Sequence, residues 1–352
     1  MTPTRVLIVD DSAVVRKLLG DALDREPDIE VVGGAADPFA ARDMILRWRP
    51  DVITLDVEMP RMDGLTFLRK LMAHHPLPVI IISSVTTRGS AASIEALRAG
   101  AVDVIAKPEG LASLGRVTER LKQRIRELRT SPPVRFRAVD TGPTRTAGAI
   151  RLAGRPTPRG LLVIGASTGG PQAIEALLTR LPADVPPTLI VQHMPAQFTA
   201  TFAARLDGVC PMRVVEATDG TALARGTVYV APGDAHLLVE ADGLRLRAAV
   251  RTGPPVHHQR PAVDVLFHSA ARLDAVPVVG VLLTGMGADG ADGLLALRRK
   301  GAETIAQDEQ SSIVFGMPRE AIALGAAGHV ATLLQMPTVI YDCFDRLARR
   351  AA

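Results

Sequence analysis

The stretch Leu161-Leu162-Val163-Ile164-Gly165-Ala166-Ser167-Thr168-Gly169-Gly170-Pro171 decides the fold of the second half of the chain. Its first four residues are apolar and predict a buried strand, and a helical pattern opens at Pro171. Small residues on both sides of Ser167 permit a sharp strand-to-helix turn that exposes the serine hydroxyl, and a helix N-terminus favours developing negative charge. The pattern predicts a nucleophilic serine and therefore a hydrolase. A serine at a helix start is also a common cap, so Ser167 needs partners before catalysis is inferred.

More strands follow this one and are mostly separated by helical patterns. They are predicted at residues 188–192, 278–283, 303–306 and 329–333. Between them, residues 212–250 contain short alternating runs and Gly-rich turns, which predict antiparallel hairpins. We therefore expect the second half to be a doubly wound α/β domain with an antiparallel β element.

Two further residues supply the partners that Ser167 needs. His193 follows the strand at residues 188–192, and Asp289 follows the strand at residues 278–283 and a short Gly-rich loop. Because parallel strands end at the same edge of a sheet, residues distant in sequence can meet there as nucleophile, base and orienting acid. The chain order Ser, His, Asp differs from the Ser, Asp, His order of α/β-hydrolases, so that fold family is not implied.

The loop around Asp289 also permits a different prediction. Residues 285–290 form a Gly-x-Gly-x-x-Gly between strand and helix, with Glu303 further along, which is the pattern of a dinucleotide site. A single match of this kind is weakly specific, and Asp289 would set a carboxylate beside the pyrophosphate, where like charges repel. The hydrolase remains the preferred interpretation.

The first half of the chain alternates short β-branched runs with amphipathic helical patterns. Nearly continuous hydrophobicity in the runs indicates strands buried on both faces, with the helices as crossovers of a parallel sheet. Five such units predict a flavodoxin-like domain with a five-stranded parallel sheet. The runs are residues 5–9, 29–33, 52–55, 78–82 and 102–106.

Polar residues follow these strands and predict a phosphorylation site. Asp10 and Asp11 follow the first strand and Asp56 follows the third, so their carboxylates converge and call for a hard cation such as Mg²⁺. Ser83 ends the fourth strand and Lys107 follows the fifth, which adds a hydroxyl and a cation able to engage an anionic group. Together they fit phosphoryl transfer to Asp56.

Composition separates these two halves. A chain of 352 residues with 47% apolar content is expected to form about two domains. The formal charge of +4 is concentrated in residues 122–159, which hold ten Lys/Arg and two acidic residues but a single aromatic, Phe136. Many Pro, Gly and Thr residues there favour a solvated linker over a nucleic-acid-binding arm. We predict a flavodoxin-like domain at residues 1–125, a flexible basic linker at 126–159 and a catalytic domain at 160–352.

The sequence also bounds the compartment. The apolar run before Asp10 is too short for a secretory signal, so a cytoplasmic protein is expected. Residues 321–341 lack formal charge, but Gly, Pro, His and Gln interrupt them, and we expect a buried helix, a strand and a helix start rather than membrane insertion. Cys210 and Cys343 are far apart and indicate neither a disulfide nor a cysteine metal site; both are expected in the core.

At the residues of the aspartate cluster, residues 4–125 resemble a two-component receiver domain. The matching positions include Met59-Pro60-x-Met62-Asp63-Gly64 and Lys107-Pro108 as well as the acids. The resemblance implies that Asp56 is the phospho-acceptor and that Ser83 and Lys107 sense the phosphoryl group. It also implies that Asp10, Asp11, Asp56 and the Glu58 carbonyl hold Mg²⁺. Val104 stands where many receivers carry Tyr or Phe, which makes aromatic-gated signalling doubtful here.

The whole chain resembles the CheB family of chemotaxis response-regulator methylesterases. The match covers both halves in order, and only the linker lacks a counterpart motif. In the family pattern the segment before Arg260 varies, so His257 and His258 receive no role. The matching segments are residues 164–170, 192–195, 231–234, 260–267, 284–290 and 314–321.

This resemblance implies a phosphorylation-activated hydrolase of glutamate γ-methyl esters on the cytoplasmic helices of chemotaxis receptors, with glutamine deamidation as a second activity. It implies a chemotaxis histidine kinase as phosphodonor and, with the Gly-rich loop, backbone N–H groups of Thr168 and Met286 as oxyanion donors. No metal or other cofactor is expected for the ester hydrolysis. The alternative is a response regulator whose second half is a non-catalytic binding module, with a basic linker that contacts nucleic acid; no helix-turn-helix or zinc-finger spacing supports it.

Overall fold

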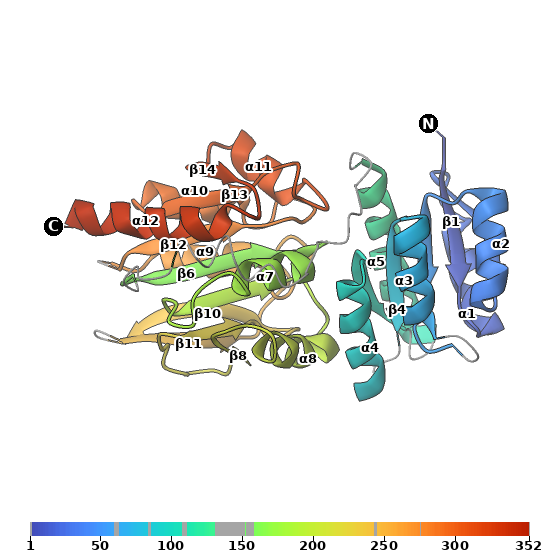
Figure 1. The fold of residues 1–352 in the computed structure, drawn as a ribbon, viewed down its shortest axis with the longest axis horizontal. Helices are drawn as coiled ribbons and strands as arrows, with labels where there is room; N and C mark the ends of the chain where they lie inside the picture. The colour runs from blue at the N-terminus through green and yellow to red at the C-terminus, as the bar shows by residue number, and fades with distance from the viewer. Residues whose placement is uncertain are drawn as a thin grey trace. The chain divides into compact units, whose positions relative to one another are not determined.

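The computed structural model describes residues 2–59, 63–83, 86–107, 111–130, 152, 158–242, 245–274 and 276–351. The chain divides into two compact units, Met1–Asp140 and Thr141–Ala352, and each is described by itself. Both units are α/β, with helices packed around a sheet (Figure 1).

The first unit contains a five-stranded sheet in the order β2-β1-β3-β4-β5, and all of its strand pairs are parallel. Its inner strands β3 and β4 are buried along their whole length, as their unbroken apolar runs predict. The order reverses between β1 and β3, and open α/β sheets bind ligands beyond the strand ends at such a point. The strands are β1 Thr4–Val9, β2 Ile29–Ala35, β3 Val52–Leu55, β4 Val79–Ser83 and β5 Asp103–Ala106; the helices are α1 Ala13–Leu23, α2 Pro38–Trp48, α3 Gly64–His74, α4 Thr87–Arg98 and α5 Leu111–Thr130.

The last helix of this unit continues further than the predicted domain boundary. α5 reaches Thr130, so it includes residues 126–130 of the segment predicted as linker. The helix continues because Leu128 still packs into the core and Arg126 forms ion pairs with Glu26 and Asp28. Most of the predicted linker, residues 131–151 and 153–157, lies outside the described residues, so the linker and its boundaries remain predictions.

The second unit contains a seven-stranded sheet in the order β14-β13-β12-β6-β7-β9-β8, again with all pairs parallel, and a separate antiparallel pair β10-β11. The strands are β6 Leu161–Ala166, β7 Thr188–Gln192, β8 Arg213–Glu216, β9 Thr227–Val230, β10 His236–Asp242, β11 Arg245–Arg251, β12 Val278–Leu282, β13 Glu303–Gln307 and β14 His329–Ala331; the helices are α7 Gly170–Leu178, α8 Ala196–Asp207, α9 Val263–Ala271, α10 Ala291–Arg299, α11 Met317–Ala323 and α12 Met336–Ala351.

The region of predicted antiparallel hairpins differs in part from the prediction. β8 and β9 pair in parallel, with Arg213 opposite Thr227, and β9 continues the main sheet beside β7. The turn at Gly220 belongs to the segment that connects these two strands, and its N–H donates to the Ala248 carbonyl of β11. Because this segment folds back over β11, β9 runs in the same direction as β8. Only β10 and β11 form the expected antiparallel hairpin.

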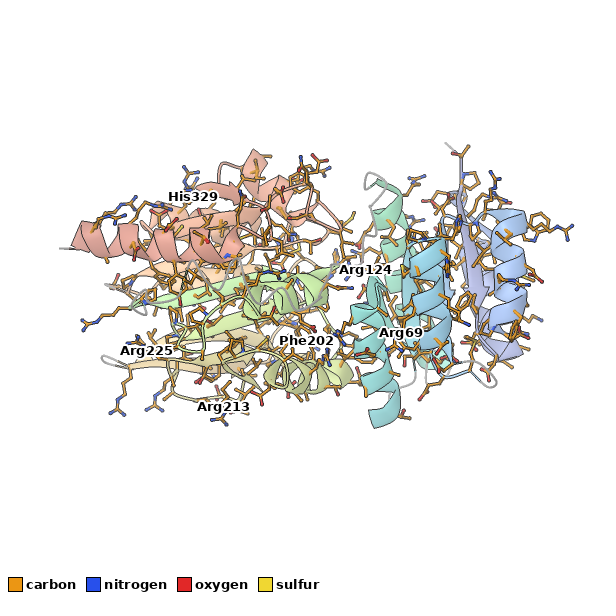
Figure 2. All side chains as sticks on the ribbon, viewed as in Figure 1. Arg69, Arg124, Phe202, Arg213, Arg225 and His329 are labelled. Carbon is orange, nitrogen blue, oxygen red and sulfur yellow. The ribbon has the colours of Figure 1, made fainter. Side chains whose placement is uncertain are left out.

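The core of the second unit lies between the sheet, the helices α9 and α10 and the β10-β11 pair. Val163, Val191, Phe267, Leu294 and Leu237 contribute to one buried cluster. Figure 2 labels buried Phe202 of α8 and, in contrast, Arg213 and Arg225, which are exposed. The charge-free segment at residues 321–341 ends α11, forms β14 and starts α12, as predicted. Among the helices of the described residues, none is both long and apolar enough to span a membrane.

Candidate active site

Ser167 occupies the predicted turn between strand and helix. It directly follows β6, its N–H donates to the Thr284 carbonyl at 3.0 Å, and its own carbonyl accepts from Gly170 N–H at 2.7 Å. Gly169 has φ +76, which glycine adopts without strain, and α7 begins immediately after it. The serine is only 1% exposed. Its position and the strand-turn-helix geometry agree with the sequence prediction, but the hydroxyl is buried rather than exposed, because the loop at Thr284 and Gly285 packs against the turn.

Two glycines keep the space around this turn open. A Cβ atom at Gly285 would lie 2.7 Å from Ser167 Cβ and 2.3 Å from Met317 Sδ. A Cβ atom at Gly170 would lie 1.9 Å from Gln192 Oε1. Any larger residue at either position would therefore displace the serine or its supporting loop.

His193 and Asp289 form a buried pair. His193 follows β7, the strand beside β6, and its N–H donates to the Ala166 carbonyl at 3.1 Å. Its Nε2 atom lies 2.7 Å from Asp289 Oδ2, and the two side chains are 1% and 2% exposed. Because a carboxylate only accepts hydrogen bonds, Nε2 carries the hydrogen and Nδ1 keeps its lone pair. The imidazole is thus held as a base whose free nitrogen is Nδ1.

The N-terminus of α9 fixes the Asp289 carboxylate. Val263 N–H donates to Oδ2 at 2.7 Å and Asp264 N–H donates to Oδ1 at 2.9 Å. Burial alone raises the pKa of Asp289, but the hydrogen bond and charge of His193 and these two N–H groups outweigh burial and hold the pKa below its usual range. Asp289 therefore remains ionised and can orient the imidazole.

The third contact of a triad is open in this structure. Ser167 Oγ and His193 Nδ1 are both buried, and neither has a hydrogen-bond partner among the described residues. The two residues follow adjacent strands, with Ala166 and Gln192 opposite each other in the register just before them. Catalytic hydrogen bonds are often formed only when substrate is bound, so two unpartnered groups at neighbouring strand ends suit a nucleophile and its base.

The acidic residues of the first unit also meet at a sheet edge. Carboxylate oxygens of Asp10, Asp11 and Asp56 lie within 4.8 Å of one another. Lys107 Nζ lies 2.9 Å from Asp10 Oδ2 and 2.7 Å from Asp56 Oδ2. The other oxygens of these carboxylates accept N–H hydrogen bonds, from Ser12 to Asp10 and from Glu58 to Asp56. Three carboxylates and one ammonium therefore share this site.

Burial and neighbouring charges have opposing effects on the pKa values of this acidic site. It raises the pKa of Asp10 despite the nearby Lys107 ammonium, whereas the carboxylates of Asp56 and Asp10 outweigh burial and raise the pKa of Lys107. Ser83 ends β4, is fully buried, and its carbonyl accepts from Lys107 N–H at 2.7 Å. Residues 60–62 and Pro108 of the predicted motif lie outside the described residues.

Comparison with known proteins gives a family for each of the two units. The CheB methylesterase family model matches residues 162–340, and the response regulator receiver domain model matches residues 6–119. This chain belongs to the CheB methylesterase family. A protein-glutamate methylesterase/protein-glutamine glutaminase of Syntrophus aciditrophicus is 50% identical over 95% of this chain and 97% of its own length. One of Anaeromyxobacter dehalogenans is 51% identical over 95% of each chain.

A solved structure from the same family covers the second unit. The crystal structure of the Thermotoga maritima CheB methylesterase catalytic domain is 36% identical and has a TM-score of 0.51, and the match covers 52% of this chain and 98% of that one. These matches favour the CheB enzyme over the alternative of a receiver with a non-catalytic binding module.

In this CheB chain, several buried polar residues support the site without having been predicted for it. Gln192 Nε2 donates to the carbonyls of Ser167 and His193, at 2.9 and 3.2 Å. Thr284 Oγ1 donates to the Thr168 carbonyl and accepts from Val314 N–H. Both residues lie in the motif segments that carry the family resemblance, which was the available signal.

Asp264 adds a second carboxylate beside Asp289. It is buried, its Oδ1 accepts from Gly293 N–H at 2.7 Å, and its Oδ2 lies 2.9 Å from His257 Nε2. Burial, followed by the charge of Asp289, raises the pKa of Asp264, although the Gly293 N–H opposes the rise. His257, which the sequence left without a role, therefore contacts the carboxylate that flanks the His193–Asp289 pair.

The Gly-rich loop that suggested a dinucleotide site serves close packing in this CheB chain. A Cβ atom at Gly290 would lie 2.6 Å from Val263 Cγ1, and Gly290 has φ +89. Asp289 points to His193 and to the start of α9 rather than to a helix N-terminus of its own. The glycines thus bring α10 against α9 and set Asp289 at the sheet edge.

Proposed function

We propose that this chain hydrolyses glutamate γ-methyl esters on methyl-accepting chemotaxis receptors and deamidates glutamine side chains there, with Ser167, His193 and Asp289 as catalytic triad. One observation carries the proposal: a buried His193–Asp289 pair on the strand end next to a buried serine whose Oγ has no hydrogen-bond partner among the described residues. The names of the relatives agree with this substrate class. The receptor helices that carry such esters are cytoplasmic, and the protein would act there.

Acylation follows from the orientation of the imidazole. Ser167 Oγ attacks the γ-carbonyl carbon while His193 Nδ1 takes the hydroxyl proton, and Nε2–H stays hydrogen-bonded to Asp289, which stabilises the cation. Collapse of the tetrahedral intermediate breaks the bond to the methoxy group. His193 returns the proton to it, and methanol leaves; with glutamine as substrate, ammonia leaves instead.

Deacylation repeats these steps with water. His193 Nδ1 accepts a proton from water, the hydroxyl attacks the acyl carbon, and Ser167 Oγ departs with the proton, which leaves a glutamate carboxyl group. We assign the oxyanion to the backbone N–H groups of Thr168 and Met286. Met286 follows Gly285, whose backbone packs against Ser167, and this supports the assignment. One such donor is worth about 2.7–4 kcal/mol.

The test of this function is Ser167→Ala. We expect release of methanol from methylated receptor to fall by about five to six orders of magnitude, because the nucleophile is lost. Ser312→Ala is the matched control, since Ser312 Oγ only donates to the Asp308 carbonyl, and it should keep the parental rate. Parental methanol release by Ser167→Ala would exclude Ser167 as the nucleophile.

We further propose that Asp56 accepts a phosphoryl group in an Mg²⁺-dependent reaction. The convergence of Asp10, Asp11 and Asp56, together with the raised pKa of Asp10, fits a site that needs a divalent cation. These carboxylates and the Glu58 carbonyl would hold the ion, which would offset charge on the phosphoryl oxygens. Lys107 and Ser83 would contact the phosphoryl group from the ends of neighbouring strands.

Phosphorylation of Asp56 is proposed to raise the esterase rate, with the chemotaxis histidine kinase as donor and with the unphosphorylated receiver restricting access to Ser167. Acetyl phosphate and Mg²⁺ should raise the rate of the parent, while Asp56→Asn should keep the basal rate and not respond. A chain without residues 1–150 should be constitutively active. Equal stimulation of parent and Asp56→Asn would contradict the role of Asp56, and a slow truncated chain would contradict the restriction.

A further inference from the structure

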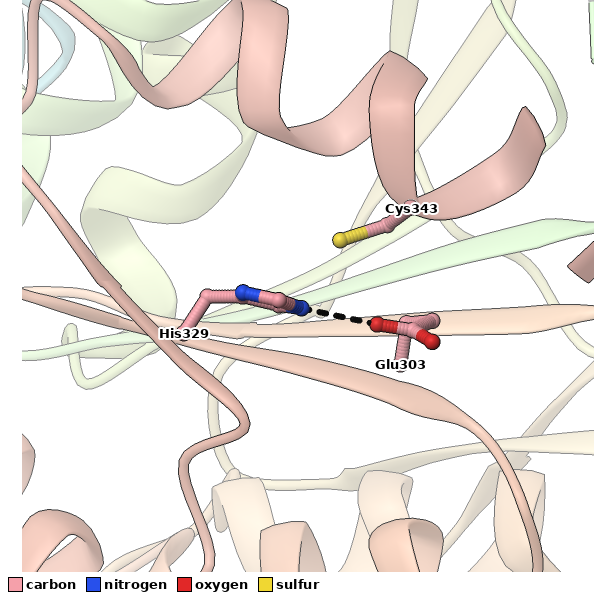
Figure 3. Close-up of side chains that lie close together, drawn as sticks. All are labelled: Glu303, His329 and Cys343. Atoms are coloured by element: carbon pink, nitrogen blue, oxygen red, sulfur yellow. Dashed lines mark hydrogen bonds and ion pairs between the residues drawn. The ribbon is translucent and has the colours of Figure 1, made fainter. Parts of the chain in front are cut away.

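A second cluster of reactive side chains lies away from Ser167. Glu303 begins β13, His329 begins β14 and Cys343 lies on α12 (Figure 3). Their ligand atoms lie within 4.8 Å of one another. Because β13 and β14 are parallel to β6 and β7, strand starts and strand ends lie at opposite edges of the sheet. This cluster is therefore at the edge opposite to Ser167 and His193 and takes no part in the proposed hydrolysis.

One nitrogen of Arg346 contacts all three groups. Its Nη2 atom lies 2.7 Å from His329 Nε2, 2.9 Å from Cys343 Sγ and 3.3 Å from Glu303 Oε2. His329 Nε2 also lies 2.8 Å from Glu303 Oε2. A ring nitrogen can donate to the carboxylate or accept from the guanidinium, but it cannot do both. The arginine therefore leaves one contact of the cluster unsatisfied.

We propose that Glu303, His329 and Cys343 bind Zn²⁺ at the position that Arg346 Nη2 occupies, with water as fourth ligand. Oxygen, nitrogen and sulfur ligands are the set that zinc prefers. Zinc bonds of roughly 2.0–2.3 Å at tetrahedral angles separate ligand atoms by about 3.3–3.8 Å, so the cluster needs only small side-chain movements. All three groups then act as acceptors toward one cation, which removes the conflict at Nε2.

The charges of this exchange balance. Zinc binding releases the Cys343 thiol proton and displaces the Arg346 guanidinium, so a zinc ion with a thiolate replaces a guanidinium with a thiol and the net charge stays +1. Arg346 is 33% exposed and can turn into water, while Arg350 keeps its contact with Glu303 Oε1 at 2.9 Å. His329 is 35% exposed, which gives the ion a route to the buried sulfur.

The three ligands come from three separate elements, so the bound ion would attach α12 to the starts of β13 and β14. Sequence spacing could not reveal this site, because residues 303, 329 and 343 have no short metal-binding motif. Without zinc, the same residues form an ion-pair network that anchors α12. The zinc site and the ion-pair network differ in one testable respect: only the zinc site predicts that the Cys343 sulfur binds an added metal ion.

Cobalt(II) is the probe, because a Co²⁺–thiolate bond gives a charge-transfer absorption band. The full-length protein is treated with chelator and titrated with Co²⁺ in excess Mg²⁺, which competes for the acidic cluster of the first unit. We expect the band to saturate at about one Co²⁺ per chain and to disappear when Zn²⁺ displaces the cobalt. Binding should release about one proton per ion. Cys343→Ser should abolish the band, while Cys210→Ser, which changes the other cysteine, should keep it.

Arg346→Gln tests the exchange itself. Because this variant lacks the competing guanidinium, it should bind cobalt at least as tightly as the parent. In a separate measurement, Zn²⁺ should raise the thermal unfolding midpoint of the parent and of Cys210→Ser but not of Cys343→Ser. His257→Gln controls for the group of His257, Asp264 and Asp289 and should leave the band unchanged. The proposal is overturned if the parent protein shows no cobalt–thiolate band, even if Arg346→Gln shows one. It is also overturned if the band persists in Cys343→Ser.

Discussion

Each unit sets aspartates at the carboxyl edge of a parallel sheet, but the two units compensate the charge differently. Asp10 and Asp56 share one side-chain cation, Lys107, and Asp11 beside them is exposed. Asp289 is compensated by His193 and by two backbone N–H groups at the start of α9. The first arrangement depends on a side-chain ammonium, whereas the second includes backbone N–H groups that the fold holds in place.

The pKa directions reflect this difference. Burial raises the pKa of both carboxyls, yet the pKa of Asp10 ends above its usual value and that of Asp289 below it. Because burial is common to both, the hydrogen bond and charge of His193, followed by the two N–H groups at the start of α9, decide the direction for Asp289. The same residue type at the same kind of sheet edge is thus suited to ion binding in one unit and to permanent orientation of a base in the other.

Among the changes that test this comparison of aspartates, the largest effect is expected from Asp289→Asn. An asparagine cannot keep the Nε2–H tautomer of His193 as a carboxylate does, so methanol release should fall by about 10⁴. Asp292→Asn is the control, because Asp292 also pairs with a histidine, His268, but on the surface. A comparable loss in the control would show that general stability, rather than orientation of His193, limits the rate.

Local sequence patterns were sufficient to predict many of the strands and turns that place these aspartates. Unbroken apolar runs predicted the buried strands β3, β4 and β6, and small residues around Ser167 predicted the turn. The strand ends then indicated which polar residues share an edge. Such features depend on neighbours in sequence, so the sequence contains them directly.

Other features depend on contacts distant in sequence and could not be predicted. The donors to Asp289 come from Val263 and Asp264 on another helix, and only packing of α9 against the sheet edge brings them there. Likewise, β8 and β9 run parallel because the segment between them packs on β11. The contact of His257 with Asp264 was invisible for the same reason.

Lys107→Met should give the next largest effect. Without the ammonium, Asp10 and Asp56 face each other unpaired, and the first unit should lose about 1–3 kcal/mol of stability without Mg²⁺. Added Mg²⁺ should stabilise this variant more than the parent, because the variant has no lysine ammonium to offset the charges of Asp10 and Asp56. Trp48 is the only tryptophan and lies on α2, so its fluorescence during urea unfolding reports on this unit. The exposed Lys70→Met is the control and should show neither change.

The smallest effect is a difference in the sign of the pH dependence. The lowered pKa of Asp289 contributes stability that is fully present above its unfolded value near 3.8 and is lost as pH falls toward the folded value. The raised pKa of Asp10 contributes stability below 3.8 that is lost as pH rises through the folded value. Relative to the parent, Asp10→Asn should therefore gain stability between pH 3 and 7 while Asp289→Asn should lose it. Urea unfolding across this range measures both slopes, with Trp48 fluorescence for Asp10 and circular dichroism for Asp289. Slopes of equal sign would mean that His193 and the donors at α9 do not distinguish Asp289 from Asp10.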